Sequence, residues 1–417
     1  MESKTIKRKM SSGYSKTQQF INFMQKIVFL HIVIFIMRWF YFLLEKFVPK
    51  NKRIALFFLT EKNYFDNSKY LFEYMRVKND FNSILFTRHK ALYKQLQKKF
   101  PGEVVYAWSF KGFLLFLRSK HVIISYGISA AAFAPYYLHK KCKNIIYLGH
   151  GIPMKKMGLQ TAVWRKYGKQ KQLQSYSYMV GSSPLEQIMH AAGFNMDMNN
   201  VWVTGLPRND YLTNPEQLNT DLLLKNPFLD RKIILYAPTW REEGHKTQFF
   251  PFEDFDADRL SKFLEEEDAY ILVRGHKEDI KRKTVQKTHD FFSIERVIKA
   301  DQDRFTDVYE LLPYVDILVT DYSSLWIDYL LLDRPVVFLP YDLEEYSQYK
   351  GFFINFDENS PGAKSGSQKE FITHLKRYFD QPLTHAKWRK KIRDMYHTYQ
   401  DNGSCERVYN EIRKLNK

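Results

Sequence analysis

The sequence predicts an α/β protein with two Rossmann-like domains that face a cleft, preceded by an apolar helix that associates with membranes. Short apolar runs alternate with longer amphipathic segments through both halves of the chain, which is the pattern of parallel sheets covered by helices. A linker-like region, residues 207–227, separates the two series. At 417 residues the chain also exceeds the size at which one hydrophobic core usually stops growing, so two domains are expected.

The predicted organisation has four parts. A basic, apolar segment precedes the two Rossmann-like domains, and a C-terminal helix packs back on the body. In order, these parts are residues 1–50, 51–215, 216–385 and 386–417.

Eleven runs read as strands because they are short, apolar and rich in β-branched or aromatic side chains. The first half contains Arg53–Leu59, Ser83–Thr87, Val104–Ala107, His121–Ser125, Asn144–Leu148, Tyr178–Gly181 and Val201–Thr204. The second half contains Lys232–Tyr236, Tyr270–Val273, Asp316–Thr320 and Pro335–Leu339, with the clearest helices at 260–267 and 324–332. Because ligands bind beyond the carboxyl ends of such strands, the residues that follow each run are the candidates for function.

The N-terminal segment combines apolar length with positive charge. Ile27–Leu44 is an 18-residue apolar run interrupted by His31 and Arg38, which share one helical stripe with Glu45. Residues 1–53 hold 11 lysines and arginines against two glutamates. The resulting excess of +9 is half of the net charge of +18. We expect a helix lying in the interface of an anionic membrane, with a true span and a helix buried on the body as alternatives.

Other classes fit less well. No cleavage site for a signal peptide follows the apolar run, and two cysteines cannot build a zinc cluster or a disulfide framework. No RNP motif or zinc pattern accompanies the positive charge, so nucleic acid is not the expected partner.

The first chemical motif is a histidine flanked by glycines. His150 lies between Gly149 and Gly151, directly after the expected strand 144–148. Without side chains on its neighbours, a ligand can approach the imidazole and the backbone amides. A general base is expected at such a strand end, and a turn with an incidental histidine is the alternative.

Three further motifs follow strands of the second half. Thr239, Trp240 and Arg241 are expected to face the cleft and hold a nucleotide or its phosphates, unless the indole packs on the core and the guanidinium is solvated. RGHK at 274–277 predicts a positive pocket for a diphosphate, with a solvated basic loop as the alternative. TDYSS at 320–324 predicts a phosphate site at a helix start, with capping alone as the alternative.

Taken together, HGIP at 150–153 with Lys155, APTWR at 237–241, RGHK and TDYSS resemble the CDP-glycerol glycerophosphotransferase family, which includes teichoic acid primases and polymerases. All four motifs occur in order, and the match extends from about residue 53 to residue 380. The resemblance implies a glycosyltransferase B-type fold in which residues 51–215 bind the acceptor and residues 216–385 bind the CDP donor.

The resemblance also implies roles for individual residues. His150 is implied as the base that deprotonates the acceptor hydroxyl, and His276 as the group that assists at the diphosphate. The substrate-binding residues that it implies are Gly149, Gly151, Ile152, Pro153, Arg208, Thr239, Trp240, Arg274, Gly275, Ser323, Ser324 and Asp328.

The implied reaction transfers glycerol phosphate from CDP-glycerol to a polyprenyl-diphosphate-linked saccharide, with release of CMP, during teichoic acid synthesis. The implied location is the cytoplasmic face of the cell membrane, as a peripheral or monotopic protein. CDP-ribitol as donor, or a nucleotide-sugar in a glycosyltransferase of the same fold, stay open as alternatives. No tightly bound cofactor is expected, although Mg²⁺ can accompany the donor diphosphate.

Overall fold

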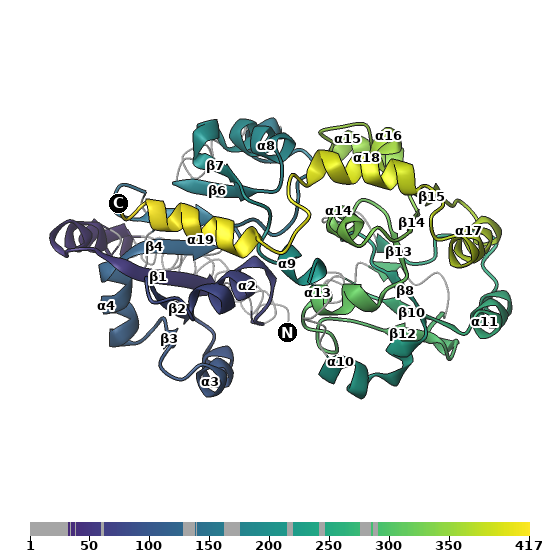
Figure 1. Ribbon diagram of the computed structural model, residues 1–417, viewed down its shortest axis with the longest axis horizontal. Helices are drawn as coiled ribbons and strands as arrows, with labels where there is room; N and C mark the ends of the chain where they lie inside the picture. The colour runs from purple at the N-terminus through teal and green to yellow at the C-terminus, as the bar shows by residue number, and fades with distance from the viewer. Residues whose placement is uncertain are drawn as a thin grey trace, which may run out of the picture.

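The computed structural model describes residues 32–33, 35–37, 39–59, 62–127, 138, 140–161, 176–214, 220–241, 247–275, 285–286 and 291–417. They form two α/β domains side by side, each built on a parallel sheet, with the chain crossing back over both near its C-terminus (Figure 1). The predicted α/β class with parallel sheets is therefore confirmed.

The first domain has a seven-stranded sheet in the order β3-β2-β1-β4-β5-β6-β7, and every pairing is parallel. Both faces of the sheet carry buried apolar side chains, and helices cover them, as is usual for parallel sheets. The strands are β1 (Asn51–Leu59), β2 (Asn82–Thr87), β3 (Val104–Tyr106), β4 (Ser119–Ile124), β5 (Asn144–Tyr147), β6 (Tyr178–Gly181) and β7 (Val201–Val203). The helices are α2 (Asp66–Met75), α3 (Lys90–Lys99), α4 (Phe110–Arg118), α8 (Pro184–Phe194) and α9 (Asn209–Leu212).

The second domain has a six-stranded parallel sheet in the order β12-β10-β8-β13-β14-β15. Its strands are β8 (Lys232–Tyr236), β10 (Ala269–Val273), β12 (Val297–Lys299), β13 (Ile317–Thr320), β14 (Val336–Phe338) and β15 (Ala363–Lys364), and a separate pair joins β9 (Thr247–Gln248) to β11 (Val285–Gln286). Its helices are α10 (Thr220–Lys225), α11 (Ala257–Glu266), α13 (Val308–Leu311), α14 (Leu325–Tyr329), α15 (Leu343–Tyr349), α16 (Phe356–Asn359) and α17 (Gln368–Asp380).

Two helices, rather than one, occupy the C-terminal segment. Helix α18 (Ala386–Tyr396) lies over the second domain and also contacts α8 of the first, and α19 (Ser404–Lys414) continues onto the first domain and packs on α2 (Figure 1). The Asp210 carboxylate accepts hydrogen bonds from the backbone amides of Ser404 and Cys405 at 2.8 and 2.7 Å, which fixes the start of α19. This crossing ties the two domains together.

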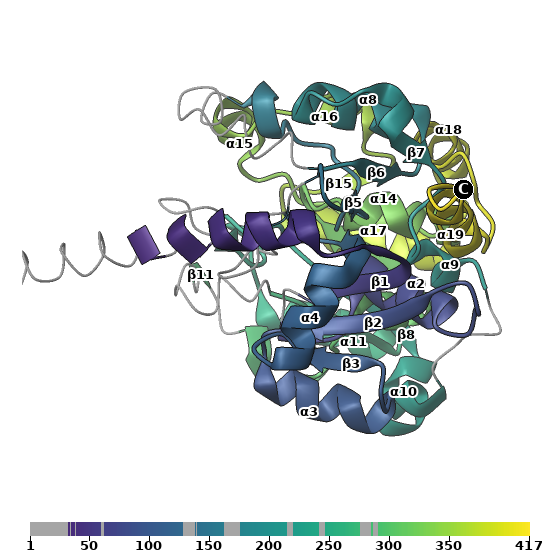
Figure 2. The ribbon, with the colours of Figure 1, turned by 90° about the vertical axis from the view of Figure 1, so that its left-hand side faces the viewer.

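The described residues between 32 and 47 are helical, and this N-terminal helix projects from the first domain (Figure 2). Among the described residues of this helix, the buried ones are near its base, where Tyr41 meets Phe116 of α4 at a ring-centroid distance of 5.3 Å and Glu45 pairs with Lys143 at 2.7 Å. No helix in the described part of the chain is long and apolar enough to cross a bilayer. Part of the predicted run, including residues 27–31, lies outside the described residues, so the interfacial helix stays a prediction.

Candidate functional site

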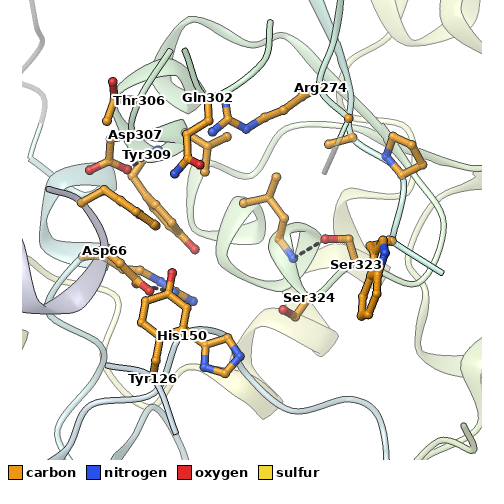
Figure 3. Close-up of a pocket in the computed structure, with 18 residues that line it drawn as sticks. Asp66, Tyr126, His150, Arg274, Gln302, Thr306, Asp307, Tyr309, Ser323 and Ser324 are labelled. Carbon is orange, nitrogen blue, oxygen red and sulfur yellow. Dashed lines mark hydrogen bonds and ion pairs between the residues drawn. The ribbon is translucent and has the colours of Figure 1, made fainter. Parts of the chain in front are cut away.

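A cavity of about 580 Å³ lies between the two domains, where the carboxyl ends of both sheets meet. Figure 3 shows side chains from both domains turned toward it, with Asp66, Tyr126 and His150 on one side and Arg274, Ser323 and Ser324 opposite. A cavity of this size suits a small molecule such as a nucleotide.

His150 stands in the loop that leaves β5. Gly149 before it has φ +74°, a conformation that a side chain would strain, so glycine is required to turn the chain there. The imidazole stacks on Tyr126 at a centroid distance of 5.0 Å, and its Nδ1 lies 3.2 Å from the hydroxyl oxygen of Tyr147. These two contacts fix the plane of the ring while it faces the cavity.

The surroundings favour the neutral form of His150. The desolvating walls of the cavity lower the pKa of the imidazole below 6.5; the Asp66 carboxylate opposes this shift and Arg208 reinforces it. If Nδ1 donates its proton to the Tyr147 oxygen, Nε2 keeps a lone pair. A neutral imidazole with a free Nε2 has the properties of a general base at pH 7.

Gly151 is the point at which the His150 loop touches the second domain. A Cβ at this position would lie 2.6 Å from the Ser324 hydroxyl oxygen, so a larger residue would require the serine side chain to move. The next two residues behave differently, because Ile152 and Pro153 are buried and do not line the cavity. Direct ligand contact by Ile152 and Pro153 stays a prediction.

Ser323 and Ser324 come from the turn between β13 and α14, and both line the cavity. The Ser323 hydroxyl accepts a hydrogen bond from the Leu325 amide at 3.3 Å, which holds the turn at the helix start (Figure 3). Serine hydroxyls on such a turn can donate to phosphate oxygens.

Arg274 follows β10 and supplies positive charge to the cavity. One guanidinium nitrogen donates to the carbonyls of Ala300 and Phe305 at 3.0 and 2.8 Å, which fixes its orientation. Burial lowers its pKa to about 10, opposed by Asp307, so it remains a cation at neutral pH. Gly275 lines the cavity beside it. His276 lies outside the described residues, so its place opposite His150 stays a prediction.

The APTWR motif divides between the cavity and the interior. Trp240 lines the cavity, whereas Thr239 does not, and the Thr239 amide donates to Asp321 at 2.7 Å. Arg241 is fully buried: its guanidinium donates twice to Asp342, both times at 2.8 Å, and lies 2.9 Å from Asp321. The expectation that Arg241 faces the cleft is wrong, because two carboxylates distant in sequence neutralise it inside the second domain.

Arg208 and Asp328 also form an internal pair. Asp328 is fully buried and lies outside the set that lines the cavity, whereas Arg208, although only 1% exposed, is among the residues that line it. They are joined at 2.7 Å, and the Tyr309 hydroxyl donates to the same Asp328 oxygen at 2.6 Å. Substrate contact by Arg208 and by Asp328 stays a prediction, and the pair also links distant parts of the fold.

Several residues that line the cavity lie outside the motifs from which the site was predicted. Gln302, Thr306 and Tyr309 follow the short strand β12 or lie in α13, and no expected strand precedes them in the sequence pattern. Asp66 begins α2, after the first strand, and an acidic residue at that helix start is a signal that could have found it.

Comparison with known proteins agrees with this geometry. Residues 40–414 match the family model described as CDP-glycerol:poly(glycerophosphate) glycerophosphotransferase. The chain belongs to this family. It is therefore a CDP-glycerol glycerophosphotransferase, as the motifs predict. Its class comprises teichoic acid glycerol-phosphate and ribitol-phosphate transferases and polymerases.

Individual relatives give the range of that class. A teichoic acid glycerol-phosphate transferase of Staphylococcus aureus is 28% identical over 85% of this chain and 90% of its own length. The ribitol-phosphate polymerase TarK of the same organism is 28% identical over 57% of this chain, and the chain spans 45% of that polymerase. The solved wall teichoic acid polymerase TagF, 23% identical, superposes with a TM-score of 0.68 over 89% of this chain and 90% of that chain, which establishes the fold.

Proposed function

We propose that this enzyme transfers glycerol phosphate from CDP-glycerol to a hydroxyl of a polyprenyl-linked teichoic acid precursor and releases CMP. The proposal rests on one observation above all. A histidine on the first domain, whose pKa is lowered by its surroundings, and an arginine with two serine hydroxyls on the second domain line the same cavity. The resemblance of His150 and the surrounding motifs to the family's pattern points the same way.

In the proposed step, the acceptor oxygen attacks the phosphorus that bears glycerol. His150 Nε2 takes the hydroxyl proton as the new P–O bond forms. The bond from that phosphorus to the bridging oxygen breaks, and CMP leaves with the electron pair. Arg274 and the hydroxyls of Ser323 and Ser324 stabilise the negative charge that develops on the phosphate oxygens. The imidazolium then returns its proton to water.

The supporting experiment uses purified full-length protein, CDP-glycerol and a lipid-linked disaccharide, with and without a first glycerol phosphate unit. Mass analysis of the lipid and measurement of CMP are expected to show equal amounts of product and CMP. CMP formation without any change in the lipid would overturn the proposed acceptor.

CDP-ribitol is the second candidate donor, because the matched relatives include a ribitol-phosphate polymerase. The same assay with CDP-ribitol separates the two donors. A kcat/KM at least tenfold higher with CDP-ribitol would replace glycerol with ribitol in the proposal.

We also propose peripheral attachment to the cytoplasmic face of the membrane through the N-terminal helix. Its exposed side chains include Phe35 at 70% and Trp39 at 59%, and Phe110 of α4 is exposed as well. Lysines and arginines of residues 1–53 would contact anionic headgroups.

Flotation with phosphatidylglycerol vesicles tests this attachment. The full chain is expected to float, and a chain lacking residues 1–50 is expected to remain in solution. Equal flotation of both proteins would show that another surface carries the attachment.

A further inference from the structure

A buried ion cluster joins the two domains at the wall of the cavity, which Asp66, Arg208 and Tyr309 line. One Nη of Arg208 donates to Asp66 of the first domain at 2.8 Å, and the other donates to Asp328 of the second domain at 2.7 Å. The guanidinium also lies over the Tyr309 ring at 4.6 Å. Arg208 is 1% exposed, and each Nη binds a carboxylate, whereas Nε has no hydrogen-bond partner among the described residues. The two Nη groups are therefore occupied at the domain boundary, although the side chain also lines the cavity.

Asn67 connects this cluster to the catalytic loop. Its side-chain oxygen accepts from the Arg208 backbone amide at 3.0 Å. Its side-chain nitrogen donates to the carbonyls of Leu148 and Gly149 at 3.2 and 2.9 Å, immediately before His150. Asn67 is fully buried and does not line the cavity, so it acts on the loop and not on a ligand.

The far end of the same loop is also tied to the second domain. The Phe353 amide donates to the Met154 carbonyl at 3.0 Å, and the Lys156 amide donates to the Gly351 carbonyl at 3.2 Å. Between the two ends, Gly151 meets Ser324. The loop that carries His150 is therefore held by hydrogen bonds at its start and its end, and its middle lies against Ser324.

We propose that Arg208 and Asn67 are positioning residues that hold His150 at a set distance from the phosphate-binding turn of the second domain. The proposal rests on the proposed function, because it assigns these residues to the proton transfer at His150. Arg208 fixes the domain boundary, and Asn67 transmits that position to the peptide before His150. A displacement of a catalytic group by about 1 Å can lower the rate about a hundredfold. Loss of the contacts of Arg208 and Asn67 is therefore expected to lower kcat.

The proposal predicts a specific division of kinetic effects. Asn67→Asp keeps the shape of the side chain but replaces the NH₂ donor with an oxygen that repels both carbonyls. We expect kcat to fall about tenfold to a hundredfold, whereas KM for CDP-glycerol stays within about threefold, because the second domain still binds the donor. Arg208→Lys keeps the charge but cannot bridge both carboxylates, and we expect the same pattern.

Two control variants make the same chemical changes on the surface. Asn82→Asp alters an exposed side chain at the start of β2, and Arg231→Lys alters an exposed pair with Asp268. Both are expected to keep wild-type kcat. Thermal unfolding of each variant identifies loss of folding, and Arg208→Lys carries the test if Asn67→Asp does not fold.

The outcomes separate this inference from the proposed function. If wild-type protein transfers no glycerol phosphate, the proposed function fails first. If the wild type is active but the folded Asn67→Asp and Arg208→Lys variants keep wild-type kcat, the positioning role is overturned. A rise in KM with unchanged kcat would also overturn it, because that result would place these residues in donor binding.

Discussion

Replacing Gly151 with alanine perturbs the contact between the two halves of the site. The added Cβ would lie 2.6 Å from the Ser324 hydroxyl oxygen but 3.6 Å from its Cβ, so rotation of the serine hydroxyl relieves the clash. That rotation turns the hydroxyl away from its place in the cavity. A hydrogen bond to a charged phosphate contributes about 1.5–3 kcal/mol. We therefore expect kcat/KM for CDP-glycerol to fall about tenfold to a hundredfold.

A double-mutant cycle gives the sharpest assay of this reasoning. Ser324→Ala should lose about as much as Gly151→Ala, and the double variant should lose little more than either, because both remove one interaction. Gly366→Ala is the matched control, since its nearest neighbour would be 3.8 Å away, and it should retain wild-type kcat/KM. Losses that multiply in the double variant would refute the proposed coupling.

Three further predictions follow from the site and the interior. Since His150 is proposed to act in its neutral form and its pKa is lowered from 6.5, the acid-side decline of kcat/KM should be centred below pH 6.5; a decline centred above pH 6.5 would remove His150 as the titrating base. Arg241→Met leaves Asp321 and Asp342 without their shared cation, so urea unfolding should show a loss of about 3–5 kcal/mol, and a loss under 1 kcal/mol would contradict the buried pair. Among the described residues no group of three or more His, Cys, Asp or Glu side chains can hold a metal, so calorimetry should detect no stoichiometric Mg²⁺ binding without CDP-glycerol, and tight binding would contradict this.

Much of the fold could be predicted because it depends on local pattern. Runs such as Lys232–Tyr236 are apolar and bounded by polar residues, and β8 occupies that same range. The convergence of His150, Arg274 and Ser324 was predictable as well, because the carboxyl ends of parallel strands meet at one edge of a sheet.

The long-range pairings could not be predicted in the same way. Arg241 reads as a cleft residue until Asp342, about a hundred positions later, is seen to bind it. Likewise, nothing near Arg208 in the sequence predicts that Asp66 and Asp328 bind its two Nη groups. Whether a charged side chain can be buried depends on the opposite charges that contact it. When those partners are distant in the sequence, no local pattern indicates them.

The role of His150 is tested most directly by CMP release from purified His150→Gln in the presence of CDP-glycerol and the lipid acceptor. If this imidazole abstracts the proton, the variant should bind CDP-glycerol like the wild type. Its rate of CMP formation should be lower by about a hundredfold or more. CMP formation near the wild-type rate would contradict the assignment of the base and, with it, the reading of the cavity between the domains.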